Sequence, residues 1–359
     1  MADLHDLSCV VHLHSTHSDG TGTVPEIMRA AHRSQTDVVL LTDHDSLGAL
    51  HDGEEGWYPP SRGAGGSSLL LVGQEISPVG GNHYLAFGLE REVDHRDLSP
   101  REIVAEVERR GGFGFAAHPF SEGSERFPWL SSLGCSMAWD DLDCLDGLEL
   151  WSFVADNGQA LASVREGLRF AITPERQITH PPTRNLELWD RMTLERRVTA
   201  IGGLDAHQFG VRIAGRAIRA MGYARSFRQL RTHVLAAGPP TGVLKHDRRL
   251  VLGALRAGRC YIAAHAVAPA HGFRFFAERL DGERAEMGEQ APPGGWTIRA
   301  DLPRRARLVL RRDGGRVDEA LDSSLEHRAE QPGVYRLEAY LHAHGAERTW
   351  ILSNPLYLR

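Results

Sequence analysis

The sequence VVLLTDHD, at residues 38–45, joins a continuous apolar run to three titratable side chains. An apolar run of this length is typical of a strand that is buried on both faces, as in a parallel sheet. Asp43, His44 and Asp45 follow where that strand would end. Because an acid or histidine buried alone is costly, these groups must be paired, hydrated or metal-bound. Taken alone, the stretch is equally well explained by a helix N-cap at Asp43 or Asp45.

The same arrangement occurs at four other places in the chain. In each, histidine, aspartate or glutamate follows a short apolar run. The runs and their polar residues are 9–11 with His12 and His14, 69–72 with Glu75 and then His83, 113–117 with His118, and 198–201 with Asp205 and His207. On a strand, side chains two residues apart point to the same side, so His12 and His14 would face one point. Each motif is ambiguous by itself.

Helical patterns lie between several of the apolar runs. One begins with Ser99 and Glu102, which form a capping box, and ends at Gly111 and Gly112. Alternation of strands and helices favours an α/β architecture with a parallel sheet or barrel. In a parallel barrel the carboxyl ends of all strands lie on one face, so the polar residues would converge there. Imidazole and carboxylate suit Zn, Mn or Fe, and about nine such groups suffice for two or three divalent ions.

The pattern changes after about residue 262. Shorter alternating segments, at 273–276, 296–302, 306–312, 334–342 and 350–359, are separated by turns rich in Pro and Gly. This is typical of a small antiparallel β-domain, and we expect a sandwich. The sequence therefore predicts two domains, a metal-binding barrel over residues 1–262 and a β-sandwich over residues 263–359.

Composition excludes several classes of protein. The formal net charge is −6, and no run of Lys or Arg exceeds two residues, so nucleic-acid binding is not expected. No apolar stretch approaches the roughly 20 residues that a membrane span needs. Residues 1–6 are polar and lack a basic segment, unlike a signal peptide. The four cysteines are scattered without a CxxC pair, which favours reduced thiols and a cytoplasmic protein.

The five motifs, in this order, resemble those of the PHP (polymerase and histidinol phosphatase) family of metal-dependent phosphoesterases. The matching pieces are HLHSTHSDG at 12–20, TDHD at 42–45, GQE at 73–75 with His83, AAHP at 116–119 and GLDAH at 203–207. Within the family the sequence is most similar to the CehA/McbA-like metallohydrolases, through LWD at 188–190, LRAGRCY at 255–261 and SNPLY at 353–357. The resemblance implies an α/β fold, an irregular (β/α)7 PHP barrel. Two further apolar runs, at 84–88 and 145–150, bring the number to seven, which agrees with seven strands.

The resemblance also implies a trinuclear metal site. The first ion would be held by His12, His14, Glu75 and Asp205, and Glu75 would bridge to a second ion held by His83 and His118. The third would be held by Asp19, His44 and His207. Asp43 would orient a ligand from outside the ligand set.

For the mechanism we expect hydrolysis by a metal-bridging hydroxide, with Glu75 and Asp205 as the central catalytic carboxylates. His17 is a candidate proton donor, although an exposed loop histidine is an equally simple interpretation. Arg212 and Arg225 are candidates for binding a substrate phosphate. The expected substrate is a small phosphate monoester or diester.

Three other functions remain open. The same metal site could hydrolyse a carboxylic or carbamate ester, and Trp57, Phe120 and Trp151 could line an aromatic slot for such a substrate. A proofreading-type exonuclease is disfavoured by the acidic charge. A non-catalytic metal-binding module is disfavoured because every metal position of the family is filled.

Overall fold

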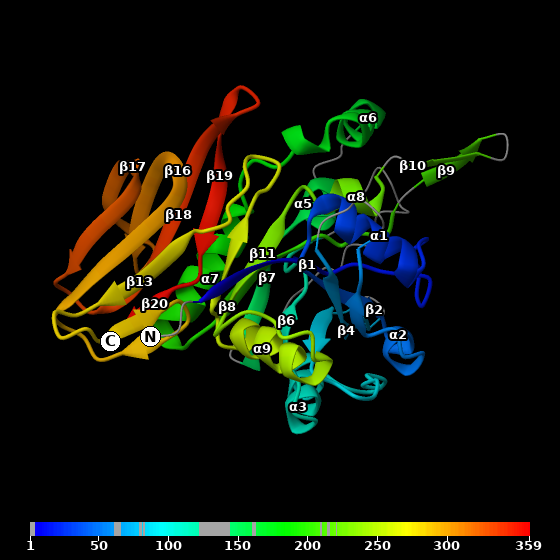
Figure 1. Cartoon of the computed structure of the whole chain (residues 1–359), viewed down its shortest axis with the longest axis horizontal. Coiled ribbons are helices and arrows are strands. Elements are labelled where there is room, and N and C mark those ends of the chain that lie inside the picture. The colour runs from blue at the N-terminus through cyan, green and yellow to red at the C-terminus, as the bar shows by residue number, and fades with distance from the viewer. Residues whose placement is uncertain are drawn as a thin grey trace.

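The computed structural model describes residues 4–60, 66–78, 81, 83–121, 144–159, 163–208, 210–213, 216–219 and 221–359. It is a mixed α/β structure, as the sequence predicts. Figure 1 shows the C-terminal strands β16–β19 gathered at one end of the molecule and helices α1 and α2 towards the other. No helix in these described ranges is long and apolar enough to cross a membrane.

The seven expected apolar runs all form neighbouring strands. They are β1 (His5–Val11), β2 (Val38–His44), β4 (Ser68–Ile76), β5 (Tyr84–Phe87), β6 (Phe113–Ala116), β7 (Gly147–Ser152) and β8 (Thr199–Gly203), paired in this order. All these pairs are parallel except those of β5, which is antiparallel to β4 and to β6. Their carboxyl ends, β5 excepted, therefore lie along one edge.

The seven-stranded barrel is not confirmed, because β8 and β1 share no continuous ladder in the described part of the chain. They are joined beyond their ends by one parallel bridge between Leu13 and Ala206 and by a hydrogen bond from Leu204 N to Val11 O of 2.9 Å. The physical reason lies in β1, whose first residues pair antiparallel with β11 (Arg231–Ala236) up to Cys9. Contact with the β8 side begins only after that pairing has ended.

Helices lie between these strands along the chain, and several of them pack against the sheet. The longer ones are α1 (Val24–Ser34), α3 (Pro100–Arg109), α6 (Val164–Ile172), α7 (Thr183–Glu195) and α9 (Leu244–Arg256). The capping box of Ser99 and Glu102 is present at the start of α3, as the sequence predicts. The apolar pattern of residues 159–169 also predicts a helix. In the described residues, Gln159 ends α5 (Phe153–Gln159) and residues 164–169 lie in α6.

Short elements fill the connections. They are α2 (Gly48–His51), β3 (Gly56–Tyr58), the 3-10 turn η2 (Pro174–Arg176), the hairpin of β9 (Gly210–Ile213) and β10 (Arg216–Arg219), and α8 (Tyr223–Ser226).

The C-terminal strands pair almost entirely antiparallel, as expected. They are β13 (Arg274–Glu278), β14 (Arg284–Glu286), β15 (Gln290–Ala291), β16 (Trp296–Arg312), β17 (Gly315–Ala329), β18 (Gly333–Ala343), β19 (Ala346–Ser353) and β20 (Leu356–Leu358). The long strand β16 lies beside β13 in its first half and beside β18 in its second, with a register break between Asp301 and Ala306.

This C-terminal region has a hydrophobic core of its own, which includes Phe275, Trp296 and Trp350. It is nevertheless continuous with the rest of the sheet, because β12 (Cys260–Ala263) pairs with β11 on one side and with β19 on the other. The division into domains at residues 262 and 263 therefore stays a prediction, as does the sandwich arrangement.

Candidate metal centre

The nine predicted metal-binding residues lie together at the carboxyl edge of the sheet. His12 and His14 follow β1, His44 ends β2, Glu75 lies near the end of β4, His118 follows β6, and Asp205 and His207 follow β8. His83 comes just before β5, and Asp19 lies in the loop after β1. All are buried except His44, which is partly exposed, and Asp19, whose side chain is 55% exposed. The parallel pairing of strands far apart in sequence places them at one edge.

Glu75 is at the centre of this cluster, and its two carboxylate oxygens face different histidines. Oε2 lies 3.1 Å from His12 Nε2 and 3.2 Å from His14 Nε2. Oε1 lies 2.8 Å from His83 Nδ1 and 3.4 Å from His118 Nε2. A carboxylate that divides its oxygens in this way is placed to bridge two cations.

A second group surrounds Asp19, whose Oδ1 lies 3.2 Å from His207 Nε2, 3.8 Å from His44 Nε2 and 3.9 Å from His14 Nδ1. The rings of His44 and His207 both stack against the ring of His14, and their centroids lie 4.3 and 4.0 Å from its centroid. Ligand atoms of these four residues lie within 4.8 Å of one another, close enough for one ion. Three overlapping groups elsewhere in the cluster meet the same test, namely His12, His14 and Glu75; His12, His118 and Asp205; and His44, Glu75 and His83.

The backbone is strained at three of these residues. His12, His118 and Asp205 have φ values of 63°, 26° and 51°, in the region that favours glycine. Each lies directly after the end of its strand or two residues beyond it, where the chain turns and the side chain is redirected towards the cluster. Strain of this kind costs on the order of 1–3 kcal/mol per residue and is concentrated at functional sites.

The electrostatics of the cluster favour positive charge between the carboxylates. Burial by itself would lower the pKa of His14, but Asp205 and Glu75 outweigh it and raise that pKa to about 9. Burial would raise the pKa of Asp19, but His207 outweighs it and lowers that pKa to about 2. Burial also opposes ionisation of Glu75 and Asp205, but the histidines around them, above all His12, outweigh it and lower the pKa of both carboxyls. These two buried carboxylates are thus held ionised, which a bound cation stabilises.

Several buried polar atoms of the cluster make no hydrogen bond with acceptable geometry. They are both ring nitrogens of His14, Nδ1 of His118 and Oδ2 of Asp205. Buried polar groups are nearly always satisfied, so four such atoms in one place require a further partner. The donor set of imidazole nitrogens and carboxylate oxygens fits zinc, manganese or iron.

Glu149, which was not predicted as a site residue, supports the cluster from outside. It lies in β7 and is fully buried. Its Oε1 lies 2.9 Å from His12 Nδ1, and its Oε2 accepts a hydrogen bond of 2.7 Å from His118 N. The signal was present in the sequence, since Glu149 interrupts the apolar run at 145–150 and a buried acid needs a partner. A second buried acid lies nearby, and burial together with Glu149 raises the pKa of Asp156 to about 8.

Two further residues of the first loop have clear contacts. Asp43 accepts hydrogen bonds from Ser15 N, Ser15 Oγ and Ser18 Oγ at 2.6–2.7 Å, so it fixes the loop that carries Asp19 rather than a ligand imidazole. His17 Nε2 lies 2.8 Å from Glu54 Oε2.

The two arginines predicted to bind phosphate receive no support from the geometry. The guanidinium of Arg225 donates hydrogen bonds to Ala171 O, at 2.7 Å, and to Ile172 O, and so it stabilises the end of α6. The backbone of Arg212 lies in β9, but its side chain is outside the described part of the structure. The role of both residues in binding substrate stays a prediction.

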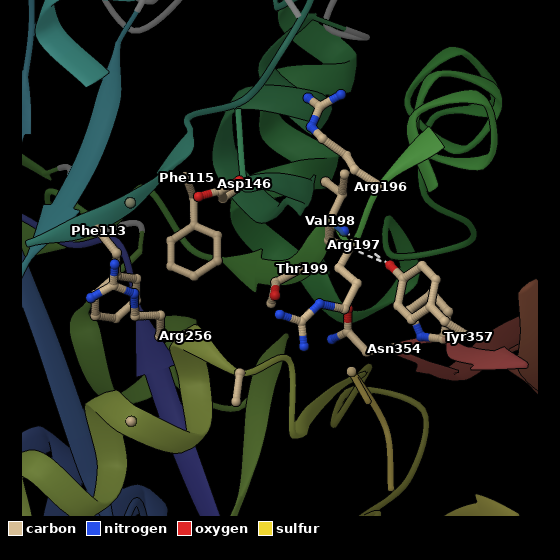
Figure 2. A pocket seen from close by; sticks show the side chains of 15 residues that line it. Phe113, Phe115, Asp146, Arg196, Arg197, Val198, Thr199, Arg256, Asn354 and Tyr357 are labelled. Atoms are coloured by element: carbon tan, nitrogen blue, oxygen red, sulfur yellow. Dashed lines mark hydrogen bonds between the residues drawn. The ribbon is translucent and has the colours of Figure 1, made fainter. Parts of the chain in front are cut away.

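A cavity of about 530 Å³ lies at the other end of these strands (Figure 2). Its lining includes Arg196, Arg197 and Arg256 together with residues that begin β6 and β8. Beside it, Val198 N donates a hydrogen bond of 2.9 Å to the hydroxyl of Tyr357. None of the nine predicted metal-binding residues lines this cavity, so it is distinct from the metal centre.

Comparison with known proteins gives matches only among solved structures. No protein-family model and no curated protein matches the chain. One similar structure is a two-domain protein of Bacteroides vulgatus that contains a predicted PHP-like metal-dependent phosphoesterase. It is 16% identical, with 98% of this chain and 96% of that chain covered and a TM-score of 0.40.

Two others cover less of the chain. A candidate metal-dependent phosphoesterase of Bifidobacterium adolescentis is 17% identical, with 60% of this chain and 91% of that chain covered and a TM-score of 0.34. An amidohydrolase of Chromobacterium violaceum with bound sulfate and no metal is 17% identical, with 55% and 87% covered and a TM-score of 0.31. These scores are low, and the interpretation of the site rests on the geometry of this chain.

Proposed function

We propose that this protein is a metal-dependent hydrolase of the PHP family that acts on small phosphate esters. The observation that carries the proposal is the division of the Glu75 carboxylate, with His12 and His14 on one oxygen and His83 and His118 on the other. This is the arrangement expected of a carboxylate between two metal ions. In this proposal residues 1–262 form the hydrolase domain, an irregular (β/α)7 barrel, and residues 263–359 form a β-sandwich beside it.

The ligand sets are those that the family resemblance implies, and the short distances from Glu75 and Asp19 to the histidines support them. His12, His14, Glu75 and Asp205 would hold one ion, and Glu75, His83 and His118 a second. Asp19, His44 and His207 would hold a third, with His14 stacked against the last two. Divalent zinc, manganese or iron bound there would activate water and neutralise charge that develops on the substrate.

The residues of the chain supply the remaining parts of the mechanism. Glu149 orients the ring of His12 by accepting from Nδ1, which leaves Nε2 turned towards Glu75. Asp43 fixes the loop that carries Asp19. His17 is held by Glu54 at the edge of the cluster, partly exposed, where a proton could pass to the leaving group.

Hydrolysis of a carboxylic or carbamate ester is the second candidate function, and the aromatic residues bear on it. Trp57 donates its indole N–H to Asp247, and Trp151 is buried in the core. Of the three, Phe120 is nearest in sequence to a predicted ligand, two positions after His118. The guanidinium of Arg184 lies over its ring at 3.9 Å. If these two side chains face the substrate, the arginine would favour an anionic substrate and the ring would suit an aryl group.

The test is phosphate release from a panel of phosphate monoesters and diesters by enzyme loaded with zinc, manganese or iron. The His12→Ala/His14→Ala variant is the control. We expect release by the native enzyme and none by the variant. If the metal-loaded enzyme releases no phosphate from any ester of the panel, the phosphoesterase proposal is rejected. Aryl carbamates are then the next substrates to assay.

A further inference from the structure

A second group of histidines lies at the opposite end of β1 from the metal centre. It consists of His233 on β11, His265 just after β12, and His271 before β13, with Asp6 on β1 behind them. Asp6 precedes His12 by six residues along an extended chain, which corresponds to roughly 20 Å at about 3.3 Å per residue. This group therefore shares no residue with the metal centre and lies too far away to join it.

The orientation of His233 is fixed by a buried carboxylate. Asp6 Oδ1 lies 2.7 Å from His233 Nδ1, and Asp6 Oδ2 accepts hydrogen bonds from the hydroxyl of Tyr261 at 2.9 Å and from Gly272 N at 2.8 Å. His233 also stacks on the ring of Tyr261, with centroids 4.6 Å apart. Because Nδ1 donates to Asp6, the lone pair of His233 is on Nε2. A carboxylate that fixes an imidazole in this way is the usual support of a metal-binding histidine.

The Nε2 atom of His233, on the side of the ring away from Asp6, lies next to a second imidazole in a cavity. His233 Nε2 and His265 Nε2 lie 2.8 Å apart. Both residues line a cavity of about 540 Å³, together with His271. His271 Nδ1 lies 3.9 Å from Asp6 Oδ2, and its side chain is 64% exposed, so it can turn towards the other two. Ligand atoms of Asp6, His233 and His271 lie within 4.8 Å of one another, and His265 is not part of that group. To complete a set of three imidazoles, His271 must therefore turn from Asp6 towards His265.

We propose that His233, His265 and His271 bind one divalent transition-metal ion of the zinc type, in a site separate from the hydrolytic centre. Two nitrogens on a tetrahedral zinc ion, at about 2.0–2.1 Å each, lie about 3.3 Å apart. The two rings need to separate by only about half an ångström to admit such an ion. Imidazole ligands without a hard oxygen cage favour zinc over magnesium or calcium.

The position of the site indicates a structural role. Asp6 is on the first strand, His233 is on β11, and His265 and His271 belong to the segment that leads from β12 into the C-terminal strands. An ion here would join three parts of the chain that otherwise meet through the sheet. Zinc bound only by the folded form raises its stability by mass action.

The test is the zinc content of the full-length protein after dialysis against zinc, measured by mass spectrometry of the metal. We expect His265→Ala to contain one zinc ion per chain fewer than the native protein. The control is His246→Ala, an exposed histidine on α9, which should keep the native content. The Glu75→Gln variant should lose metal from the hydrolytic centre and still lose one further ion when His265→Ala is added, so the two proposals can fail separately.

Cobalt provides a second readout, because the visible spectrum of the substituted protein reports histidine ligation. The His265→Ala spectrum subtracted from the native one should show bands of a single site, and activity should be unchanged. If His265→Ala does not fold, His271→Ala replaces it, with zinc affinity at this site expected to fall at least tenfold. Equal zinc content and equal spectra in the variants and the His246→Ala control would overturn the proposal, and the two imidazoles would then be joined only by a hydrogen bond.

Discussion

Glu75 and Glu338 are both buried carboxylates, but their partners differ in kind. Glu75 is surrounded by histidines, whereas Glu338 on β18 is held by arginines and a tyrosine. Arg336 Nη1 lies 2.6 Å from Glu338 Oε1, Arg311 Nε lies 2.8 Å from the same oxygen, and the hydroxyl of Tyr340 donates to Oε2 at 2.5 Å. The first carboxylate lies at the carboxyl edge of the parallel strands, and the second lies within the C-terminal antiparallel strands.

The difference in partners distinguishes a buried carboxylate that can bind a ligand, Glu75, from one that stabilises the fold, Glu338. Arginine is always protonated and offers no lone pair, so it neutralises Glu338 permanently and can bind no metal. A neutral histidine has a lone pair to give, so the partners of Glu75 can turn from the carboxylate to an ion. Strained backbone at His12, His118 and Asp205 is found with the first kind of site.

The sharpest test of this comparison is Glu75→Gln. We expect hydrolysis to fall by on the order of 10⁴-fold, because the residue that joins two ligand groups is lost. The fold should remain, since an amide fills the same volume. Turnover and metal content of the purified variant are the measurements. Near-native turnover with a full complement of metal would remove Glu75 from the centre.

The opposite outcome is expected for Glu338→Gln. Removing this charge leaves Arg311 without its carboxylate, while Arg336 keeps its two hydrogen bonds to Asp190 at 2.7 and 2.8 Å. We therefore expect a loss of about 1–3 kcal/mol of unfolding free energy. Turnover per folded molecule should stay near native. Urea unfolding measures the loss, with Glu326→Gln as control, because its exposed pair with Arg299 contributes about 1 kcal/mol or less. Equal stability of the two variants would contradict the assignment.

A smaller effect is expected for Glu149→Gln, which keeps the ligands and loosens their support. Loss of the carboxylate behind a metal-binding histidine lowers metal affinity by about 10–100-fold. Competition with a chelator measures that affinity. The matched control is Glu106→Gln on α3, whose partly exposed carboxylate pairs with Arg109 and not with a ligand of the cluster, so this variant should bind metal as the native protein does. An unchanged metal affinity in Glu149→Gln would show that the Glu149 carboxylate is not needed to orient the His12 ring.

The smallest effect is expected for Arg184→Ala. If this arginine meets an anionic substrate beside Phe120, KM should rise by less than about tenfold with kcat little changed, because an exposed ion pair is weak. Arg191→Ala, another exposed arginine of α7, is the control. An identical KM in both variants would exclude Arg184 from substrate binding and favour a neutral ester.

Much of the candidate site could be predicted from the sequence. Apolar runs such as 38–41 are buried because they carry no polar group, and the acids and histidines that follow them need partners. The nine residues expected to converge do lie together. Glu149 was missed because its run at 145–150 is read as a buried strand, although one buried acid in such a run is itself a signal.

Other features depended on contacts between distant segments. Three such features are the antiparallel direction of β5, the pairing of β1 with β11 and the limited contact of β1 with β8. They depend on which strand edges remain unpaired, and this cannot be predicted from a local sequence pattern. Arg225 illustrates the same limit, since its carbonyl partners at Ala171 and Ile172 are more than fifty residues away.

The sequence by itself determined the strands, their polar ends and the ligand types, because burial and residue chemistry are local properties. Only the tertiary structure decided how those ends are shared, with Glu75 placing one oxygen towards His12 and His14 and the other towards His83 and His118. It also brought Asp6 against His233, which lies 227 positions further along the chain. Such contacts depend on strand order and register, which are fixed by the whole fold.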